Sequence, residues 1–331
     1  MKKLIIFFIA FMLCGCSGNK SLEQKAARML LVRCNENIEK AIDKGAGGVI
    51  LFAKDLEGLS KDEVKNKIKA MKKSAKVPLI IAVDEEGGTV VRVSSNPNLR
   101  HEKFKSPMEY YKEGGFDLLE KINAERAELL LDLGINLNLA PVADMAKENS
   151  FIYERTLGED TKTTSEYIRR SVKTAKEKGI MSCLKHFPGY GQNADTHTGT
   201  AVDTRGYEEF QSSDFLPFVA GIEAGAEFVM VSHNTVKCID PDLPVSLSQK
   251  WHKVLRNELG FGGVIITDDM AMDAVGEYEN AYATAAACGN DMLIVSDFDE
   301  ALEQIVNAVK NGEIEESVLD RAIENIEKIV K

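Results

Sequence analysis

Eight short apolar runs recur along this chain, each separated from the next by a longer stretch in which apolar residues return at helical spacing. Most of the runs are continuously hydrophobic, which is the pattern of strands buried on both faces. Strands of this kind are parallel, and their connections usually contain a helix. The eight candidate strands are Met29–Val32, Gly48–Phe52, Leu79–Val83, Asn136–Pro141, Met181–His186, Phe228–Ser232, Val264–Thr267 and Met292–Ser296.

The intervening stretches predict helices, and several close with a glycine just before the next strand, as helices with a left-handed last residue do. Eight strands that alternate with helices predict an α/β fold, a closed (β/α)8 TIM barrel. The alternative is an open doubly wound sheet, but no glycine-rich phosphate motif follows the first strand. The predicted helices are Ser60–Ala75, Leu118–Leu133, Thr163–Lys178, Phe210–Ala224, Ser248–Leu259 and an outer helix Ser317–Val330, and the closing glycines are Gly45, Gly134, Gly179, Gly225 and Gly289.

The length of 331 residues fits one large domain, and no Pro/Ser-rich linker divides it. We therefore expect residues 17–331 to form a single catalytic barrel. The formal net charge is −11, with no stripe of Lys and Arg of the kind that phosphate backbones require. The composition thus predicts no nucleic-acid partner.

The first sixteen residues have a different character from the rest of the chain. Lys2 and Lys3 precede an apolar run, Leu4–Leu13, that is too short to span a bilayer stably. A basic start, a short apolar run and small residues describe a secretory signal. Its end, Leu13-Cys14-Gly15-Cys16, resembles a bacterial lipoprotein box, which implies that Cys16 receives the lipid and becomes the new N-terminus. We expect residues 1–16 to be removed in part as a signal peptide and the protein to be exported and lipid-anchored, outside the cytoplasmic membrane. An ordinary signal peptide that contains cysteine is the alternative.

Four cysteines remain outside this segment, and their spacing matches neither a zinc site nor a dense disulfide framework. Cys183 lies within an apolar run, which predicts a side chain in the core. The spacing leaves a disulfide open.

The barrel architecture predicts that functional side chains lie just past the C-terminal ends of strands. Polar residues follow five of the predicted strands, and three of the five histidines, His186, His197 and His233, fall at or after such ends. These polar segments are Asp84-Glu85-Glu86-Gly87-Gly88, the region of Asp144, Lys185-His186-Phe187-Pro188-Gly189-Tyr190-Gly191, Ser232-His233-Asn234 and Thr267-Asp268-Asp269.

Asp268 follows the apolar run Val264-Ile265-Ile266, so its carboxylate is expected in the mouth of the barrel. A carboxylate there is a competent nucleophile for an anomeric carbon with oxocarbenium character. The alternative is an N-cap for the turn Met270–Val275, where Asp is favoured. One residue of the pair Asp268 and Asp269 could serve each purpose.

A retaining glycosidase also needs a group that donates and then accepts a proton. The Gly-rich segment 189–199 contains Asp195-Thr196-His197, and residues two apart can share one side of an extended loop. Asp195 would then hold the tautomer of His197 and favour its charged form. The alternative is a surface loop with an incidental histidine.

Taken in order along the chain, these segments resemble the motifs of glycoside hydrolase family 3, and specifically its single-domain β-N-acetylglucosaminidase branch. The similarity runs from about Ser21 to Ser296. It rests on Lys185-His186-Phe187-Pro188-Gly189, Asp195-x-His197, Thr267-Asp268-Asp269-Met270-x-Met272, Asp84-x-Glu86-Gly87-Gly88 with Val90 and Arg92, Ala140-Pro141-Val142-x-Asp144 and Glu154-Arg155-x-x-Gly158.

The resemblance implies that Asp268 is the nucleophile and that His197, with Asp195 as partner, is the acid/base. Larger members of the family carry a second domain with a Glu acid/base; since this chain ends soon after the eighth strand, we expect the proton donor to come from the barrel. Tyr190 stands where the family usually has His, and Thr89 where it usually has Arg. The sugar-binding residues that the family implies are Asp84, Arg155, Lys185 and His186 and, less directly, Arg92 and His233; the alternative for each is an ion pair at the barrel mouth.

The function implied is hydrolysis of terminal β-linked N-acetylglucosamine, from peptidoglycan fragments or chitin oligosaccharides, with no cofactor and no metal. One alternative is a phosphorylase, in which phosphate replaces water as the second nucleophile. Another is an inactive, lipid-anchored protein that binds cell-wall glycan. A metal hydrolase would want paired His ligands at strand ends, but the first strand ends in Val32-Arg33-Cys34.

Overall fold

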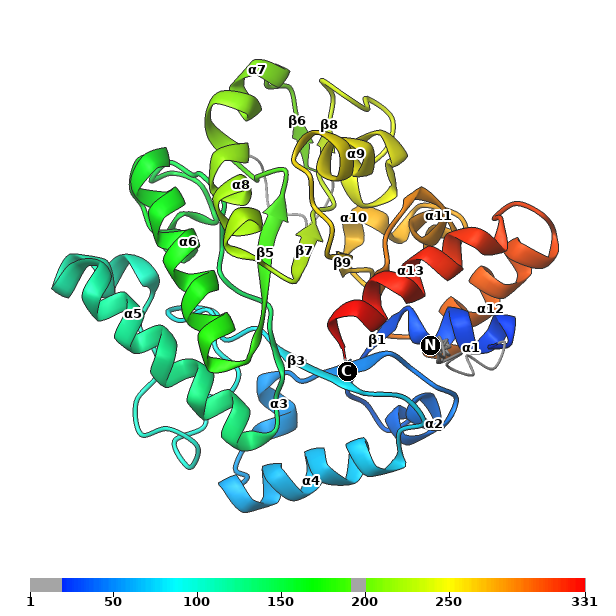
Figure 1. Ribbon diagram of the computed structural model, residues 1–331, viewed down its shortest axis with the longest axis horizontal. Coiled ribbons are helices and arrows are strands. Elements are labelled where there is room, and N and C mark those ends of the chain that lie inside the picture. Colours follow the sequence, from blue (N-terminus) through cyan, green and yellow to red (C-terminus); the bar gives the residue numbers. More distant parts are fainter. Residues whose placement is uncertain (1–19, 192–200, 331) are drawn as a thin grey trace, which may run out of the picture.

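A computed structural model describes residues 20–191 and 201–330, and Figure 1 shows a barrel of strands surrounded by helices. Eight parallel strands pair side by side and the last returns to the first, which confirms the predicted (β/α)8 barrel and all eight predicted strands. In barrel order they are β1 (Leu30–Arg33), β2 (Gly48–Ile50), β3 (Ile80–Val83), β4 (Leu137–Asn138), β5 (Met181–Phe187), β7 (Phe228–Val231), β9 (Val264–Asp269) and β10 (Met292–Val295).

The helices largely follow the prediction, with differences at three of them. Helix α5 starts earlier than expected and is broken at Gly114 and Gly115, whose backbone is not helical. The predicted helix 210–224 begins as a π-helical turn, and the predicted helix 248–259 ends as one. The helices are α1 (Leu22–Arg28), α2 (Ile38–Asp43), α3 (Ala53–Leu56), α4 (Lys61–Ser74), α5 (Pro107–Leu133), α6 (Thr161–Lys178), α7 (Tyr207–Glu209), α8 (Phe215–Ala224), α9 (Gln249–Lys253), α10 (Asp273–Gly276), α11 (Ala281–Cys288), α12 (Phe298–Lys310) and α13 (Glu316–Ile329).

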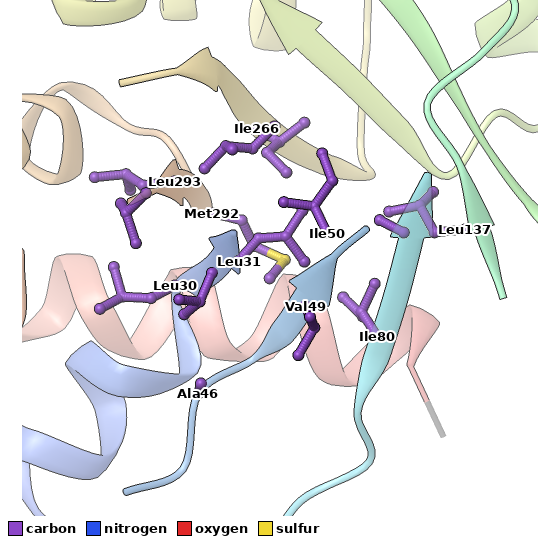
Figure 2. Close-up of a cluster of buried hydrophobic side chains, with 14 of the residues drawn as sticks. Leu30, Leu31, Ala46, Val49, Ile50, Ile80, Leu137, Ile266, Met292 and Leu293 are labelled. Atoms are coloured by element: carbon purple, nitrogen blue, oxygen red, sulfur yellow. The ribbon is translucent and has the colours of Figure 1, made fainter. Parts of the chain in front are cut away.

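The barrel core consists of the apolar runs that predicted the strands, as Figure 2 shows for Leu31, Ile80, Leu137 and Ile266. These side chains are fully buried, and each contributes about 1.5–3 kcal/mol relative to an exposed position. Cys183 is also fully buried in this core, as predicted. It and the other cysteines within the described ranges are free thiols.

Helices α1 and α13 close the end of the barrel at which the strands begin (Figure 1). Asn325 of α13 donates to the carboxylate of Asp291, which directly precedes β10. Arg28 of α1 donates to the carbonyl oxygens of Gly47 and Pro78, which lie at the starts of β2 and β3. These contacts leave the opposite end, where the strands finish, for the loops with the predicted functional residues. Within the described ranges, no helix combines the length and the apolar character needed to cross a membrane.

Candidate active site

A pocket opens at the end of the barrel where the strands finish, with a volume of about 580 Å³ that includes its opening to solvent. This size lies within the range of roughly 300–1,000 Å³ that is usual for small-ligand sites. Four of its apolar residues come from the second, fourth, sixth and eighth barrel strands or directly follow them, in the layer pattern of such barrels. These are Ile50, Leu139, Met230 and Ile294; Phe52 and Val90 add apolar surface from loops, and the polar residues Asp84, Lys185 and Asp268 belong to the third, fifth and seventh strands or directly follow them.

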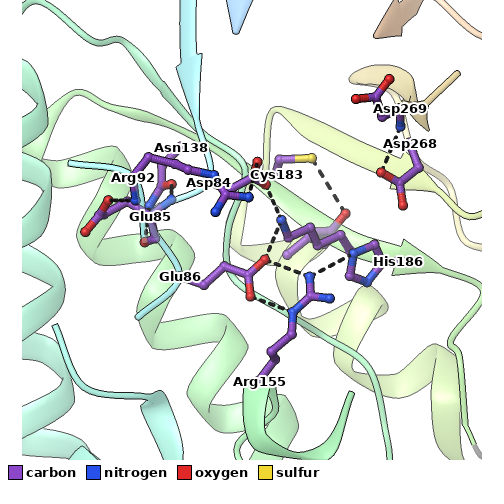
Figure 3. A network of polar contacts seen from close by, with 12 residues as sticks. Asp84, Glu85, Glu86, Arg92, Asn138, Arg155, Cys183, His186, Asp268 and Asp269 are labelled. Atoms are coloured by element: carbon purple, nitrogen blue, oxygen red, sulfur yellow. Dashed lines mark hydrogen bonds and ion pairs between the residues drawn. The ribbon is translucent and has the colours of Figure 1, made fainter. Parts of the chain in front are cut away.

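The polar side of the pocket is organised around the carboxylate of Glu86, which is 2% exposed (Figure 3). Arg155 donates two hydrogen bonds to it, at 2.9 and 2.8 Å, and the Lys185 ammonium lies 2.6 Å away. Lys185 also donates to Asp84 at 2.6 Å. Burial alone would raise the pKa of Glu86, but the charges of Arg155 and Lys185 outweigh it and hold that pKa well below its ordinary value. The carboxylate is therefore ionised at all physiological pH values.

His186 extends this network toward Asp144, a buried carboxylate beyond β4. The ring nitrogen Nδ1 lies 2.8 Å from Asp144, and Nε2 lies 3.2 Å from the Arg155 guanidinium. Because a guanidinium only donates, Nε2 is the acceptor and the ring proton is on Nδ1, where Asp144 receives it. The backbone amide of Tyr190 donates to the other oxygen of Asp144, and the Tyr190 ring packs edge-on against His186 with centroids 5.0 Å apart. Tyr190 thus supports a residue of the pocket.

Glu85 fixes the loop that follows β3. Its carboxylate accepts hydrogen bonds from the backbone amides of Arg92, Val93 and Ser94 at 2.7, 2.6 and 3.1 Å. Its own backbone is bonded to the side chain of Asn138. The loop is folded back by these bonds, so that the Arg92 guanidinium lies 3.7 Å from Asp84 at the pocket wall.

Asp268 faces the pocket from the opposite side, at the end of β9 (Figure 3). Burial raises the pKa of its carboxyl, but its neighbours, among them the backbone amide of Asp269, which donates to it at 2.8 Å, and the charge of Lys185, lower that pKa more, so the net pKa is below the ordinary value. The carboxylate is therefore available as a nucleophile. The neighbouring Asp269 accepts from the amide of Ala271 and pairs with Arg33 at 3.3 Å, and burial raises its pKa. Asp269 therefore makes the hydrogen bond to the turn, and neither aspartate caps helix α10, whose N-cap residue Met272 makes no side-chain cap bond.

The structure brings most of the predicted site residues to one pocket. Its wall includes Asp84, Arg92, Arg155, Lys185, His186 and Asp268. His233 lies beside the end of β9, where Nε2 contacts the carbonyl oxygen of Asp269 at 3.1 Å and Nδ1 contacts the Ser246 hydroxyl at 2.7 Å. The residues predicted for proton transfer, Asp195 and His197, and the predicted lipidation site Cys16 lie outside the described residues.

Sequence reasoning did not assign roles to three residues that the geometry makes important. Glu86 and Asp144 belong to motifs that the sequence displays, so their position at strand ends was the available signal. Phe52 lines the pocket and lies under the Arg33 guanidinium at 4.6 Å, but a single aromatic residue after β2 gives no such signal. In the part of the chain that the structure describes, no group of three His, Cys, Asp or Glu side chains is placed to hold a metal ion.

The mouth of this parallel barrel holds an ionised, buried carboxylate opposite charged side chains that can bind hydroxyl groups. This is the arrangement of a (β/α)8-barrel glycosidase. The chain belongs to glycosyl hydrolase family 3: residues 21–329 match the model of that family's N-terminal domain. This confirms the resemblance predicted from the motifs.

Known relatives agree with this assignment. A protein of Nitrosomonas eutropha named "Beta-hexosaminidase" is 33% identical over 274 residues, covering 79% of this chain and 77% of the relative. A glycoside hydrolase family 3 β-N-acetylglucosaminidase from Paenibacillus superposes with a TM-score of 0.88 at 26% identity; the match covers 94% of this chain and 62% of the other. A β-N-acetylhexosaminidase from Beutenbergia cavernae gives 0.84 at 25% identity, covering 94% and 98%. These names support a β-N-acetylhexosaminidase function.

Replacing Glu86 by Gln should lower the free energy of unfolding near neutral pH by about 3–5 kcal/mol, because Arg155 and Lys185 lose their shared buried counter-charge. The folded pKa of Glu86 lies below its ordinary value of 4.5, so its contribution is complete above that pH and is lost as the pH falls below it. Denaturant unfolding of both proteins at neutral pH and near pH 3.5 measures the difference. We expect it to shrink at the lower pH. The exposed neighbour Glu154→Gln is the control, and a pH-independent difference would contradict the role of the charge.

Proposed function

We propose that this chain is a retaining β-N-acetylglucosaminidase that hydrolyses terminal β-linked N-acetylglucosamine. One observation carries the proposal: the ionised carboxylate of Asp268 lines the same pocket as Asp84, Arg155 and Lys185. Carboxylates and cations of this kind bind the hydroxyl groups of a sugar, and a carboxylate across from them can reach its anomeric carbon. The names of the relatives, a beta-hexosaminidase and a β-N-acetylglucosaminidase, support N-acetylglucosamine as the sugar that is released.

The proposed reaction is a double displacement. Asp268 attacks the anomeric carbon while the bond to the leaving oxygen breaks, and His197 gives that oxygen its proton. A water molecule then attacks the same carbon, transfers a proton to His197 and releases the carboxylate together with the free sugar. Asp195 holds the imidazole in the tautomer that both steps require.

The ion-pair network prepares the pocket for a neutral, hydroxyl-rich ligand. Lys185 and Arg155 are held by carboxylates before the sugar arrives, so little side-chain freedom remains to be lost on binding. Asp84 is 14% exposed and can accept hydrogen bonds from two adjacent hydroxyl groups. The apolar residues below them suit the C–H face of the ring and the acetamido methyl group.

We further propose that the protein is an exported lipoprotein, anchored through Cys16 to the bacterial membrane, and that peptidoglycan fragments are its natural substrates, with chitin oligosaccharides as the alternative. The N-terminal pattern of basic, apolar and small residues supports export, and its Cys16 supports lipidation. Cell-wall glycan is the N-acetylglucosamine polymer that an enzyme at this location would meet.

Asp268→Asn should abolish release of N-acetylglucosamine from an N-acetylglucosamine–N-acetylmuramic acid fragment, because an amide cannot form the glycosyl ester. Product analysis by chromatography, with and without phosphate, checks this. Asp273→Asn, an exposed residue of α10, is the matched control and should keep normal turnover. Unaltered turnover by Asp268→Asn would refute the nucleophile, and a sugar 1-phosphate product would identify a phosphorylase instead.

His197→Ala should lower kcat/KM for the natural disaccharide by roughly 10²–10⁴-fold, the usual contribution of general acid catalysis. An aryl glycoside with a dinitrophenolate leaving group needs no proton, so its kcat/KM should fall by less than about tenfold. Steady-state kinetics on both substrates measures the ratio. His101→Ala, at an exposed histidine, is the control. Equal losses on the two substrates would argue against an acid role.

Cys16→Ser should move the protein from the membrane fraction to the soluble fraction of the producing bacterium, since no thiol remains to carry the lipid. Metabolic labelling with a radioactive fatty acid should mark the wild type but not this variant. Cys14→Ser, two residues earlier in the same segment, should stay labelled and membrane-bound. Labelled Cys16→Ser would refute the assignment of the lipidation site.

A further inference from the structure

The segment 192–200, which carries the proposed acid/base, is flanked by described chain on both sides. On the leading side, Gly189 and Gly191 follow β5. On the returning side, strand β6 (Val202–Asp203) pairs in parallel with β8 (Thr235–Val236), and the amide of Thr235 donates to the carbonyl oxygen of Ala201. The amide of Gly189 in turn donates to the carbonyl oxygen of His186 at 2.8 Å, so each flank has a contact outside the segment itself.

One side chain, Arg205, connects the two flanks. Its guanidinium donates to both carboxylate oxygens of Asp203, at 2.7 and 2.9 Å to Oδ2 and at 3.2 Å to Oδ1. It also donates to the carbonyl oxygen of Gly189 at 3.1 Å and to Asp214 at 2.9 Å. The Phe210 ring lies beneath it, 4.2 Å from the guanidinium carbon. A planar, five-donor group is the side chain best able to join this many acceptors at once.

The two glycines of the leading flank are in direct contact with this cluster. Gly189 and Gly191 have φ angles of 121° and 57°, in the region that favours glycine. A Cβ atom on Gly189 would lie 2.5 Å from an Asp214 oxygen, and one on Gly191 would lie 2.6 Å from the Arg205 guanidinium carbon. Arg205 and Asp214 thus pack flat against the main chain just before residue 192.

The leading flank also connects to the sugar-binding side of the pocket. The amide of Tyr190, between the two glycines, donates to Asp144 at 2.7 Å, and the other oxygen of Asp144 holds His186. Arg205 itself is absent from the pocket lining among the described residues. Its influence on a bound sugar must therefore pass through the chain that it holds.

We propose that Arg205 is a positioning residue for the acid/base: together with Asp203 and Asp214 it fixes the described chain on both sides of segment 192–200 relative to the pocket. The proposal rests on the proposed function, in which His197 protonates the leaving oxygen. Proton transfer requires a heavy-atom separation of about 2.6–3.2 Å. A misplacement of about 1 Å from a distant change can cost on the order of 10²-fold in rate. Fixing both ends of a nine-residue segment limits such misplacement.

Arg205→Lys tests the proposal, because it keeps the charge but loses the fork that joins Asp203, Asp214 and Gly189. We expect kcat/KM for the natural disaccharide to fall by roughly 10–100-fold, while that for the dinitrophenyl glycoside falls by no more than about threefold. Asp203→Asn, which weakens the same clamp from the returning side, should give the same pattern. Arg169→Lys, at an exposed arginine of α6, is the control. Parallel losses on both substrates, or unchanged kinetics in a folded variant, would overturn the proposal.

A double-mutant cycle separates this proposal from the proposed function. If His197 is the acid and Arg205 acts through it, Arg205→Lys should have no further effect on disaccharide turnover once His197 is Ala. If the double variant instead loses turnover by the product of the two separate fold-losses, Arg205 acts independently of His197, and the positioning role is overturned. If His197→Ala alone shows no dependence on the leaving group, the acid role fails instead. Thermal unfolding of each variant identifies losses that arise only from destabilisation.

Discussion

The site depends on one buried carboxylate held between two cations. Glu86 belongs to the loop after β3, Lys185 to β5 and Arg155 to the connection between β4 and β5, so their contacts join three segments distant in sequence. Such a group is costly to desolvate alone and stable only with both partners in place. The same contacts place Lys185 and Arg155 beside Asp84 and His186 in the lining of the pocket. The interaction that closes the loops is therefore also the one that orders the binding surface.

The barrel separates the parts of the chain that stabilise it from the parts that react. At the end where the strands begin, side chains of α1 and α13 form hydrogen bonds with the chain just before the strands. Arg28 donates to the carbonyl oxygen of Gly47, and Asn325 donates to the carboxylate of Asp291. At the other end, alternate strands contribute apolar and polar side chains, so apolar and ionic surfaces line the pocket together. A sugar has the matching character, with C–H faces and a rim of hydroxyl groups. Because parallel strands close into a barrel, alternate strands contribute apolar and polar side chains, and only the residues at the strand ends need to be of a particular kind.

The sequence predicted the barrel well because buried parallel strands are continuous apolar runs. It also predicted that Asp84, Lys185 and Asp268 meet, since all strand ends of a closed barrel share one rim. It could not predict the break in α5 at Gly114, because glycine adopts helical and non-helical backbone conformations with similar ease. Nor could it predict which atoms pair. Glu85 accepts from the backbone of its own loop, whereas Glu86 pairs with Arg155. The direction of each side chain decides this difference, and two adjacent glutamates in a sequence do not reveal it.

The charge of the pocket explains why an imidazole suits the proposed second catalytic role. Four carboxylates, Asp84, Glu86, Asp268 and Asp269, line it with three cations, Arg92, Arg155 and Lys185. A further carboxyl group would add like charge beside Asp268 when it acts as base, and repulsion would raise the pKa of one of them. An imidazole is positive in its acid form and neutral in its base form, so neither state repels the nucleophile. Its attraction to the carboxylates does not by itself define a position. Placement must come from the chain that carries the imidazole, and among the described residues Arg205 and Asp144 hold the chain that flanks it.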